Sequence, residues 1–194
     1  MPWLIIVILG YLLGSIPTAY IAGHLLKGED IRQMGDGNMG AANAYRELGP
    51  KAGIAVFFVD AGKGALAILI AQAAGIPQAA ILTTGAAAVI GHNWPVYIGF
   101  RGGQGESTTI GVLSTLMIQP MLVVGAIAGV AFLITRRVIL GQGPFLFIPL
   151  PLVCWWLGVP GVLLVYGIAL PCLVGFTHFL NLRTRQVVDT SRAE

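Results

Sequence analysis

Residues 52–74 read AGIAVFFVDAGKGALAILIAQAA, and this stretch decides the fold class. Its only ionisable residues are Asp60 and Lys63, and the run is long enough to cross a bilayer as a helix, which takes about 20 residues. The apolar residues are largely consecutive, whereas a membrane-spanning β-strand alternates apolar and polar residues. The stretch therefore predicts a membrane-spanning α-helix.

The composition of the whole chain extends this prediction to other segments. Of the 194 residues, 56% are hydrophobic and 10% are charged, whereas a soluble domain carries about 25% charged residues. Helices and closed barrels are the only structures that span a bilayer, so we expect an all-α polytopic membrane protein. The candidate segments are 3–26, 52–74, 77–99, 107–119, 121–135, 144–157 and 160–181.

The fourth and fifth segments could instead form one long helix kinked at Pro120, and the basic residues decide between the two counts. With seven helices and the N-terminus outside, every Lys and Arg except Lys63 falls in a cytoplasmic loop or in the C-terminal tail. The positive-inside rule requires this distribution, and a merged helix would place Arg136 and Arg137 outside. We therefore predict seven transmembrane helices, an outside N-terminus, a cytoplasmic C-terminus and a single domain over residues 1–194.

Small residues in two of these segments indicate close helix packing. GYLLG (10–14) and GAAA (85–88) place glycine and alanine where two helix backbones can approach each other.

The first predicted cytoplasmic loop contains the glycine-rich stretch RQMGDGNMGAANAYRELG, residues 32–49. Glycines such as Gly37 allow successive backbone N–H groups to point at one anion, and Arg46 can bind anion oxygens with its guanidinium fork. Asn38 and Asn43 add amide groups. The alternative is an ordinary loop built from turn-forming residues, but a long loop in so compact a protein favours a binding role.

Asp60 and Lys63 lie three residues apart on one face of the predicted helix at 52–74. Ionisable residues inside a membrane are candidates for function, although these two could simply form a salt bridge with each other. A self-contained pair at this depth gains little over two leucines. We therefore expect Lys63 to face a water-filled pocket that holds an anion.

The stretch GHNWPVYIGFRGGQGESTTIG, residues 91–111, adds a third polar group at the same depth. His92 lies about seven residues before the cytoplasmic end of the predicted helix at 77–99, a depth that overlaps that of Asp60 and Lys63. A lone histidine is often only a satisfied polar group, but here Arg101, Gly102 and Gly103 follow and the next helix begins directly after them. A glycine-rich turn at a helix N-terminus is an anion-binding arrangement.

Near the cytoplasmic end of the last helix, His178 and Asn181 are one helical turn apart and are further candidates. The four patches together suit one or two phosphate-bearing ligands at a membrane interface. Cys154 and Cys172 lie in apolar runs, where small buried hydrophobes are the usual interpretation. The chain has no Ser-His-Asp set, metal cluster or P-loop, so we expect no metal and no cofactor.

These motifs, in this order, resemble the bacterial inner-membrane family of acyl-phosphate:glycerol-3-phosphate acyltransferases. The resemblance covers nearly the whole chain and rests on GSIPTAY (14–20), GDGNMGAAN, DAGKG, GHNWPVYIGFRGGQG and HFLN. It implies that an acyl group moves from acyl-phosphate to the 1-hydroxyl of glycerol 3-phosphate, giving lysophosphatidate for phospholipid synthesis. It also implies an active site that faces the cytoplasm, contact with membrane lipids and no nucleic-acid partner.

The resemblance also implies roles for individual residues. His92, Asn38 and Lys63 would be the catalytic group, with His92 orienting a substrate or assisting proton transfer. The residues that would bind phosphate or support the site are Gly37, Asn43, Arg46, Arg101, Gly102, Gly103, His178 and Asn181. No nucleophilic residue is required, because acyl-phosphate is already activated and positioning with charge stabilisation suffices.

The chain differs from the family pattern at several positions. Asp36 and Ala42 replace a serine and a threonine, Gln104 replaces a lysine, and Glu106 follows where the family has small residues. Further differences are Ile139, Gln142 and Thr184. Together they leave two alternatives open: a divergent paralogue that acts on a different, less anionic substrate, or a non-enzymatic lipid-binding or transport protein.

Overall fold

The computed structural model describes the backbone of residues 3–135 and 144–193, and the side chains of residues 3–134 and 146–181. Every regular element in these ranges is helical. The elements are α1 (Trp3–Gly14), α2 (Thr18–Lys27), η1 (Ile31–Gln33), α3 (Ala41–Glu47), α4 (Pro50–Ala73), α5 (Gln78–Asn93), η2 (Val96–Ile98), α6 (Glu106–Leu116), α7 (Ile118–Thr135), α9 (Pro144–Phe147), α10 (Leu150–Trp156) and α11 (Gly161–Ala193).

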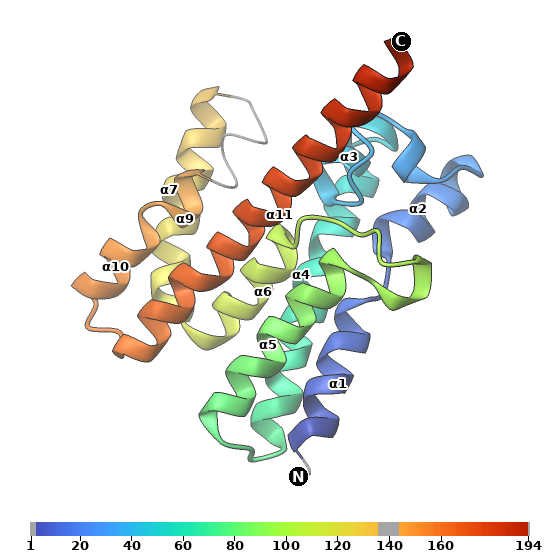
Figure 1. Ribbon diagram of the computed structural model, residues 1–194. Coiled ribbons are helices and arrows are strands. Elements are labelled where there is room, and N and C mark those ends of the chain that lie inside the picture. Colours follow the sequence, from blue (N-terminus) through green and yellow to red (C-terminus); the bar gives the residue numbers. More distant parts are fainter. Residues whose placement is uncertain (1–2, 136–143, 194) are drawn as a thin grey trace.

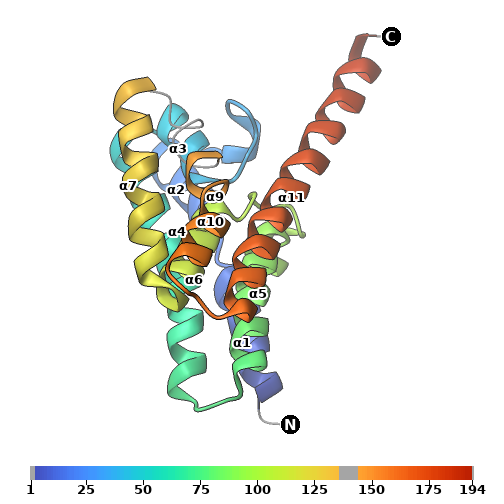
Figure 2. The same ribbon diagram turned by 90° about the vertical axis from the view of Figure 1, so that its left-hand side faces the viewer.

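The helices form a bundle in which the chain repeatedly reverses direction. It rises through α1, descends through α4, rises through α5, descends through α6 and rises through α7, and α9 and α10 descend before α11 rises (Figures 1 and 2). The N-terminal and C-terminal ends therefore lie at opposite ends of the bundle. α2, α3 and the segment between α5 and α6 gather toward the end at which α11 terminates.

The outside of the bundle suits a bilayer. Within the described ranges, three helical stretches are long and apolar enough to cross a membrane, namely Trp3–Lys27, Pro50–Ala73 and Gly161–Asn181. Large apolar side chains such as Phe58, Trp155 and Trp156 point outward and are 67%, 72% and 73% exposed. In water such side chains would be costly to expose together, whereas lipid accommodates them.

The predicted helix at 52–74 and the predicted division of 107–135 into two helices are confirmed. The segment 52–74 corresponds to α4. The segments 107–119 and 121–135 correspond to separate helices, α6 and α7, which pack against each other. The chain breaks at Met117 rather than at Pro120, and Pro120 lies in the first turn of α7, where its missing N–H costs no helical hydrogen bond.

Other predicted boundaries are wrong, and prolines explain most of the differences. The segment 3–26 is divided into α1 and α2 just before Thr18, because Pro17 disfavours helical geometry in the residue that precedes it. For the same reason the segment 77–99 is helical only to Asn93, two residues before Pro95. The segment 144–157 is divided into α9 and α10 around Pro149. The last helix continues beyond 181 to Ala193.

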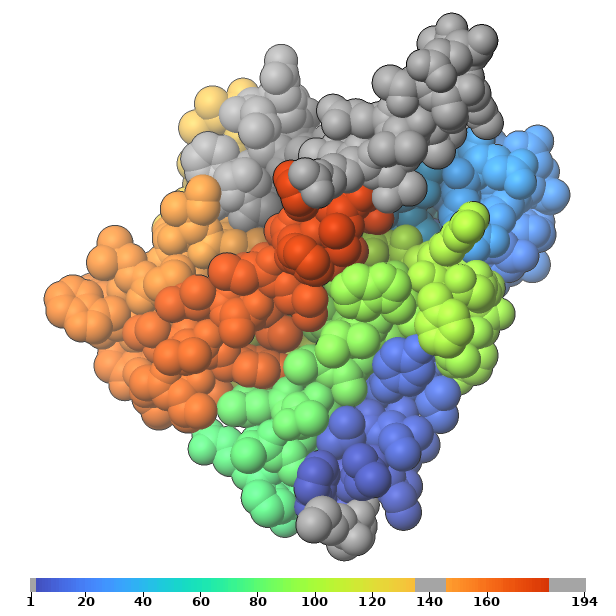
Figure 3. All heavy atoms as spheres, in the orientation of Figure 1, coloured from blue at the N-terminus to red at the C-terminus, as the bar shows by residue number. Residues whose placement is uncertain are grey.

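Close contacts between helix backbones hold the bundle together at the level of the polar residues. A side chain at Gly14 would collide with the backbone of Ala88, so the close helix packing predicted for the 10–14 stretch is confirmed, and its partner is the helix that contains 85–88. A side chain at Gly64 on α4 would likewise collide with the backbone of Thr108 on α6. α11 then lies diagonally across α5 and beside α10 (Figure 3).

Candidate active site

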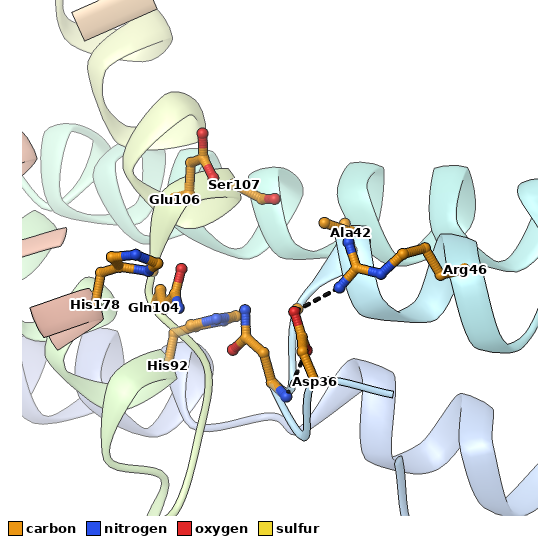
Figure 4. A pocket seen from close by; sticks show the side chains of 12 residues that line it. Asp36, Ala42, Arg46, His92, Gln104, Glu106, Ser107 and His178 are labelled. Atoms are coloured by element: carbon orange, nitrogen blue, oxygen red, sulfur yellow. Dashed lines mark hydrogen bonds and ion pairs between the residues drawn. The ribbon is translucent and has the colours of Figure 1, made fainter. Parts of the chain in front are cut away.

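A polar cavity of about 90 Å³ lies where the first loop, the end of α5, the start of α6 and α11 meet. Figure 4 shows Glu106 and Ser107 on α6, His92, Gln104 and His178 close by, and an ion pair between Asp36 and Arg46 on the side of α3. The lining residues are Asp36, Asn38, Gly40, Ala41, Ala42, Arg46, His92, Gln104, Gly105, Glu106, Ser107 and His178. Four predicted site residues, His92, Asn38, Arg46 and His178, therefore come together.

The first loop is shaped by Asn43, whose side chain is fully buried. The Asn43 amide donates to the backbone oxygens of Ile31 and Met34, at 3.3 and 3.1 Å, and its oxygen accepts from the N–H of Asp36. Gly37 has a φ of +65°, in the left-handed region that favours glycine. Neither residue lines the cavity, so both shape the loop that does.

Asp36 connects this loop to α3. One carboxylate oxygen accepts from the N–H of Asn38 at 2.9 Å, and the other pairs with the Arg46 guanidinium. Arg46 supplies the only Lys or Arg side chain among the cavity-lining residues that the structure describes. An anion that enters the cavity therefore meets a cation that already has a carboxylate partner.

His92 lies in the last turn of α5 and is 4% exposed. Its Nδ1 atom is 3.7 Å from a carboxylate oxygen of Asp60 on α4. On another side, a Cβ atom added to Gly103 would lie only 2.2 Å from His92 Nε2. The imidazole is thus held between α4 and the turn after α5.

Lys63 does not occupy the position that the sequence predicts. It is 5% exposed, lies 2.8 Å from an Asp60 oxygen and donates to the backbone oxygen of Ile16 at 2.9 Å. It does not line the polar cavity, so the structure pairs Lys63 with Asp60 where the sequence predicts contact with a bound anion. Its partners are the adjacent Asp60 carboxylate and the carbonyl of Ile16, which also accepts from the N–H of Thr18 at 3.1 Å.

The N–H groups of Gly102 and Gly103, which the sequence predicts to bind an anion, already have backbone partners. The N–H of Gly102 donates to the Asn93 oxygen and that of Gly103 to the His92 oxygen, both at 3.1 Å. These amides therefore satisfy carbonyls at the end of α5. Glycine is required at Gly102 because an added Cβ would lie 2.1 Å from the His92 oxygen.

One buried hydrogen bond joins α5 to α11. Asn93 donates to the Thr177 hydroxyl at 2.9 Å, and since the neighbours of these two residues are His92 and His178, the bond sets the relative position of the two histidines. Asn181 lies on the same helix but does not line the cavity.

Arg101 is exposed and lies outside the cavity lining. Arg136, Arg137, Ile139 and Gln142 lie outside the described residues, as does the side chain of Thr184.

Four polar residues in the cavity were not predicted as site residues, namely Asp36, Gln104, Glu106 and Ser107. Gly105 precedes α6 with a φ of +81°, and Glu106 is the first residue of the helix. An acidic residue and a hydroxyl at a helix start are the sequence signal that could have identified two of them, since the helix dipole favours negative charge there.

A second, apolar cavity of about 630 Å³ adjoins the polar one and shares Ala41 and Ala42 with it. It runs between α3, α4, α6 and α7 and is lined by residues such as Phe57, Gly129 and Phe132. A polar cavity that borders a long apolar one suits a ligand with a charged head and a hydrocarbon chain.

Comparisons with known proteins agree with this geometry. The family model described as "Glycerol-3-phosphate acyltransferase" matches residues 4–186. The chain is 48% identical to glycerol-3-phosphate acyltransferase 4 of Dehalococcoides mccartyi over 95% of this chain and 99% of the relative. It is also similar to two crystal structures of PlsY, an integral membrane glycerol 3-phosphate acyltransferase.

The glycerol 3-phosphate form of PlsY superimposes with a TM-score of 0.84 and 36% identity, over 96% of this chain and 93% of the other. The lysophosphatidic acid form gives a TM-score of 0.79 and 34% identity over the same shares.

Proposed function

This chain belongs to the glycerol-3-phosphate acyltransferase family, and we propose that it transfers an acyl group from an acyl phosphate to the 1-hydroxyl of glycerol 3-phosphate. The products are lysophosphatidate and inorganic phosphate. The observation that carries the proposal is the pair of adjoining cavities, one polar with Arg46 and one apolar, which meet at Ala41 and Ala42. An acyl phosphate has the same division into head and chain.

The hydrocarbon chain of the donor occupies the apolar cavity. Gly125 and Gly129 on α7 line this cavity, and nothing lies within 4 Å of the place where a side chain on either glycine would begin. The missing side chains leave room beside Phe57 for an extended chain. Burial of each methylene group contributes about 0.8 kcal/mol, so the chain supplies much of the binding energy for the donor.

The phosphate groups lie near Arg46, and Asn38 donates a hydrogen bond to them. Because Arg46 is paired with Asp36, phosphate binding requires this pair to open or to share the guanidinium. The pair is more than a third exposed on both sides, and exposed pairs contribute only about 0–1 kcal/mol. A dianionic phosphate competes successfully with such a partner because it offers more charge and more acceptor oxygens.

In the chemical step, the 1-hydroxyl oxygen attacks the carbonyl carbon of the acyl phosphate and a new carbon–oxygen ester bond forms. The bond from that carbon to the phosphate oxygen breaks with its electron pair, and the hydroxyl proton moves to the departing phosphate. No covalent enzyme intermediate is required. The protein contributes orientation and charge stabilisation, which together account for large rate accelerations.

The other predicted residues hold this arrangement in place. Asp60 and Lys63 fix the His92 ring, which orients the reacting groups. Gly102 and Gly103 close the turn against the end of α5, and Asn43 and Gly37 hold the first loop. His178 lines the cavity from α11, where we propose that it supports the acceptor, with Asn181 and Arg101 at the periphery.

We further propose that the chain crosses a bacterial inner membrane seven times, with its N-terminus outside and the cavity facing the cytoplasm. Two observations support this topology. The N-terminal and C-terminal ends of the bundle lie on opposite sides (Figure 1), as an odd number of crossings requires. The basic residues Lys27, Arg32, Arg46 and Arg101 all lie in the segments at the end that holds the cavity, in agreement with the positive-inside rule. A reporter fused to the C-terminus tests it, since a fluorescent protein should fold in the cytoplasm and a periplasmic phosphatase should stay inactive.

The activity test uses the purified full chain in detergent with palmitoyl phosphate and labelled glycerol 3-phosphate. We expect lysophosphatidate and inorganic phosphate in equal amounts, and Arg46→Ala should raise the KM for glycerol 3-phosphate more than Arg46→Lys does. Palmitoyl coenzyme A is the matched donor control and should give no product. Product from the coenzyme A donor alone would refute the proposed donor, and no product from either donor would refute the proposed reaction.

A further inference from the structure

Glu106 is the one acidic residue that lines the polar cavity without a partner in the described part of the chain. Its Oε1 atom is buried and makes no hydrogen bond there. None of the ion pairs among the described residues includes Glu106. Asp36, the other acidic residue of the cavity, is paired with Arg46.

A buried carboxyl oxygen without a partner destabilises the folded protein, because it has lost its hydration and gained no hydrogen bond in return. Such a group is expected where a ligand completes the arrangement. A phosphate fits this position less well, since an ionised carboxylate repels phosphate oxygens and Arg46 provides the proposed phosphate position on the other side of the cavity. A hydroxyl group fits, because a carboxyl oxygen accepts a hydrogen bond from a hydroxyl in either protonation state.

The arrangement of the cavity separates these two kinds of contact. Glu106 and Ser107 come from the start of α6, and Arg46 comes from α3 on the other side (Figure 4). A small acceptor that carries a phosphate at one end and hydroxyls along its carbon chain can therefore contact both sides at once.

We propose that Glu106 binds the hydroxyl of glycerol 3-phosphate that does not react, the one on carbon 2, and so selects a polyol phosphate over an acceptor that lacks this hydroxyl. The proposal rests on the proposed function and adds a specificity-determining residue to it. Ser107 lies beside Glu106 and provides a second hydroxyl partner for the same group.

The test compares glycerol 3-phosphate with 3-hydroxypropyl phosphate, which keeps the reacting hydroxyl and the phosphate but lacks the hydroxyl on carbon 2. The purified full chain should prefer glycerol 3-phosphate by at least about tenfold in kcat/KM, because a site built to bind a hydroxyl rejects an analogue without it. Glu106→Leu should reduce this preference to about threefold or less. Glu106→Gln keeps an acceptor oxygen and should retain most of it.

Thermal unfolding gives an independent measurement. Glu106→Leu removes the unpaired buried oxygen and should raise the Tm in the absence of substrate, while the rise in Tm that glycerol 3-phosphate causes should become smaller.

An unchanged preference in active Glu106→Leu protein would overturn the proposal. An equal loss of activity with both acceptors would overturn it too, because Glu106 would then act on the reacting hydroxyl. If the unmodified protein uses neither acceptor, the proposed function fails, and this result is distinct from the first two.

Discussion

Replacement of Gly103 by alanine should slow the reaction by moving His92. The added Cβ would lie 2.2 Å from His92 Nε2 and 2.8 Å from the Met39 oxygen. Ordinary contacts begin near 3.4 Å, so the ring or the turn has to shift by about 1.2 Å to relieve the contact. The ring is 4% exposed and lies against Asp60 on α4, so most of this shift changes its position in the cavity.

A displacement of about 1 Å in an active site costs on the order of 10²-fold in rate. We therefore expect Gly103→Ala to lower kcat about a hundredfold in the acyl-phosphate assay. Overpacking costs about 1–3 kcal/mol of stability, which for a chain of this size lowers the Tm by roughly 2–12 °C. Gly62→Ala is the matched control, since nothing lies within 4 Å of that position on α4, and its activity should be unchanged.

A double variant shows whether the effect passes through His92. In a His92→Ala background the ring is absent, so the added methyl group of Gly103→Ala should cost little further activity. Folded Gly103→Ala protein with normal kcat would refute the reasoning. So would fully additive losses in the double variant, because the two residues would then act independently.

Three other results are expected. Thr177→Val leaves the buried Asn93 amide without its acceptor and should cost about 1–3 kcal/mol in thermal or denaturant unfolding, whereas Thr177→Ser should not. Gly129→Phe narrows the apolar cavity and should shift the kcat/KM preference toward shorter acyl phosphates; an unchanged preference would place the chain elsewhere. The Arg32 guanidinium that is hydrogen-bonded to Asp30 holds the pKa of that carboxyl below its ordinary value of 3.8. The pair therefore stabilises the protein above this pH, and the contribution is lost as the pH falls through the lowered pKa. Asp30→Asn should lower the Tm at pH 7 by roughly 1–4 °C, and the difference should shrink toward pH 3.

The fold class and the segments with uninterrupted helices follow from hydropathy. α4 matches its predicted boundaries within two residues because no proline interrupts it after Pro50. Hydropathy did not predict the break before Pro17 or the early end of α5, since the chain continues with further apolar residues after each of them. In these places the backbone geometry imposed by proline decides the structure, and an average over a window of residues does not register it.

The site was predicted only in part. Residue types indicate what chemistry a side chain can perform, but they do not indicate which neighbour it pairs with in the folded protein. His92, Asn38, Arg46 and His178 meet in one cavity, as their types and depths indicated. Lys63 was misplaced because its partner is Asp60, only three residues away.

The backbone partners of Gly102 and Gly103 were not predicted for a related reason. A glycine-rich turn reveals available donors, but it does not reveal that the last carbonyls of α5 accept from them.

The positions at which this chain differs from the family pattern bear directly on which acceptor the cavity can bind. Every such residue whose side chain the structure describes, namely Asp36, Ala42, Gln104 and Glu106, lines the polar cavity. These residues surround Arg46 and His92 and change the balance of charge in the cavity. An unpaired carboxyl at Glu106 and a paired one at Asp36 weaken attraction to phosphate while adding contacts for hydroxyl groups. If the proposed function holds, we expect recognition of the acceptor to depend more on its hydroxyls than it would in a cavity lined by lysine and serine.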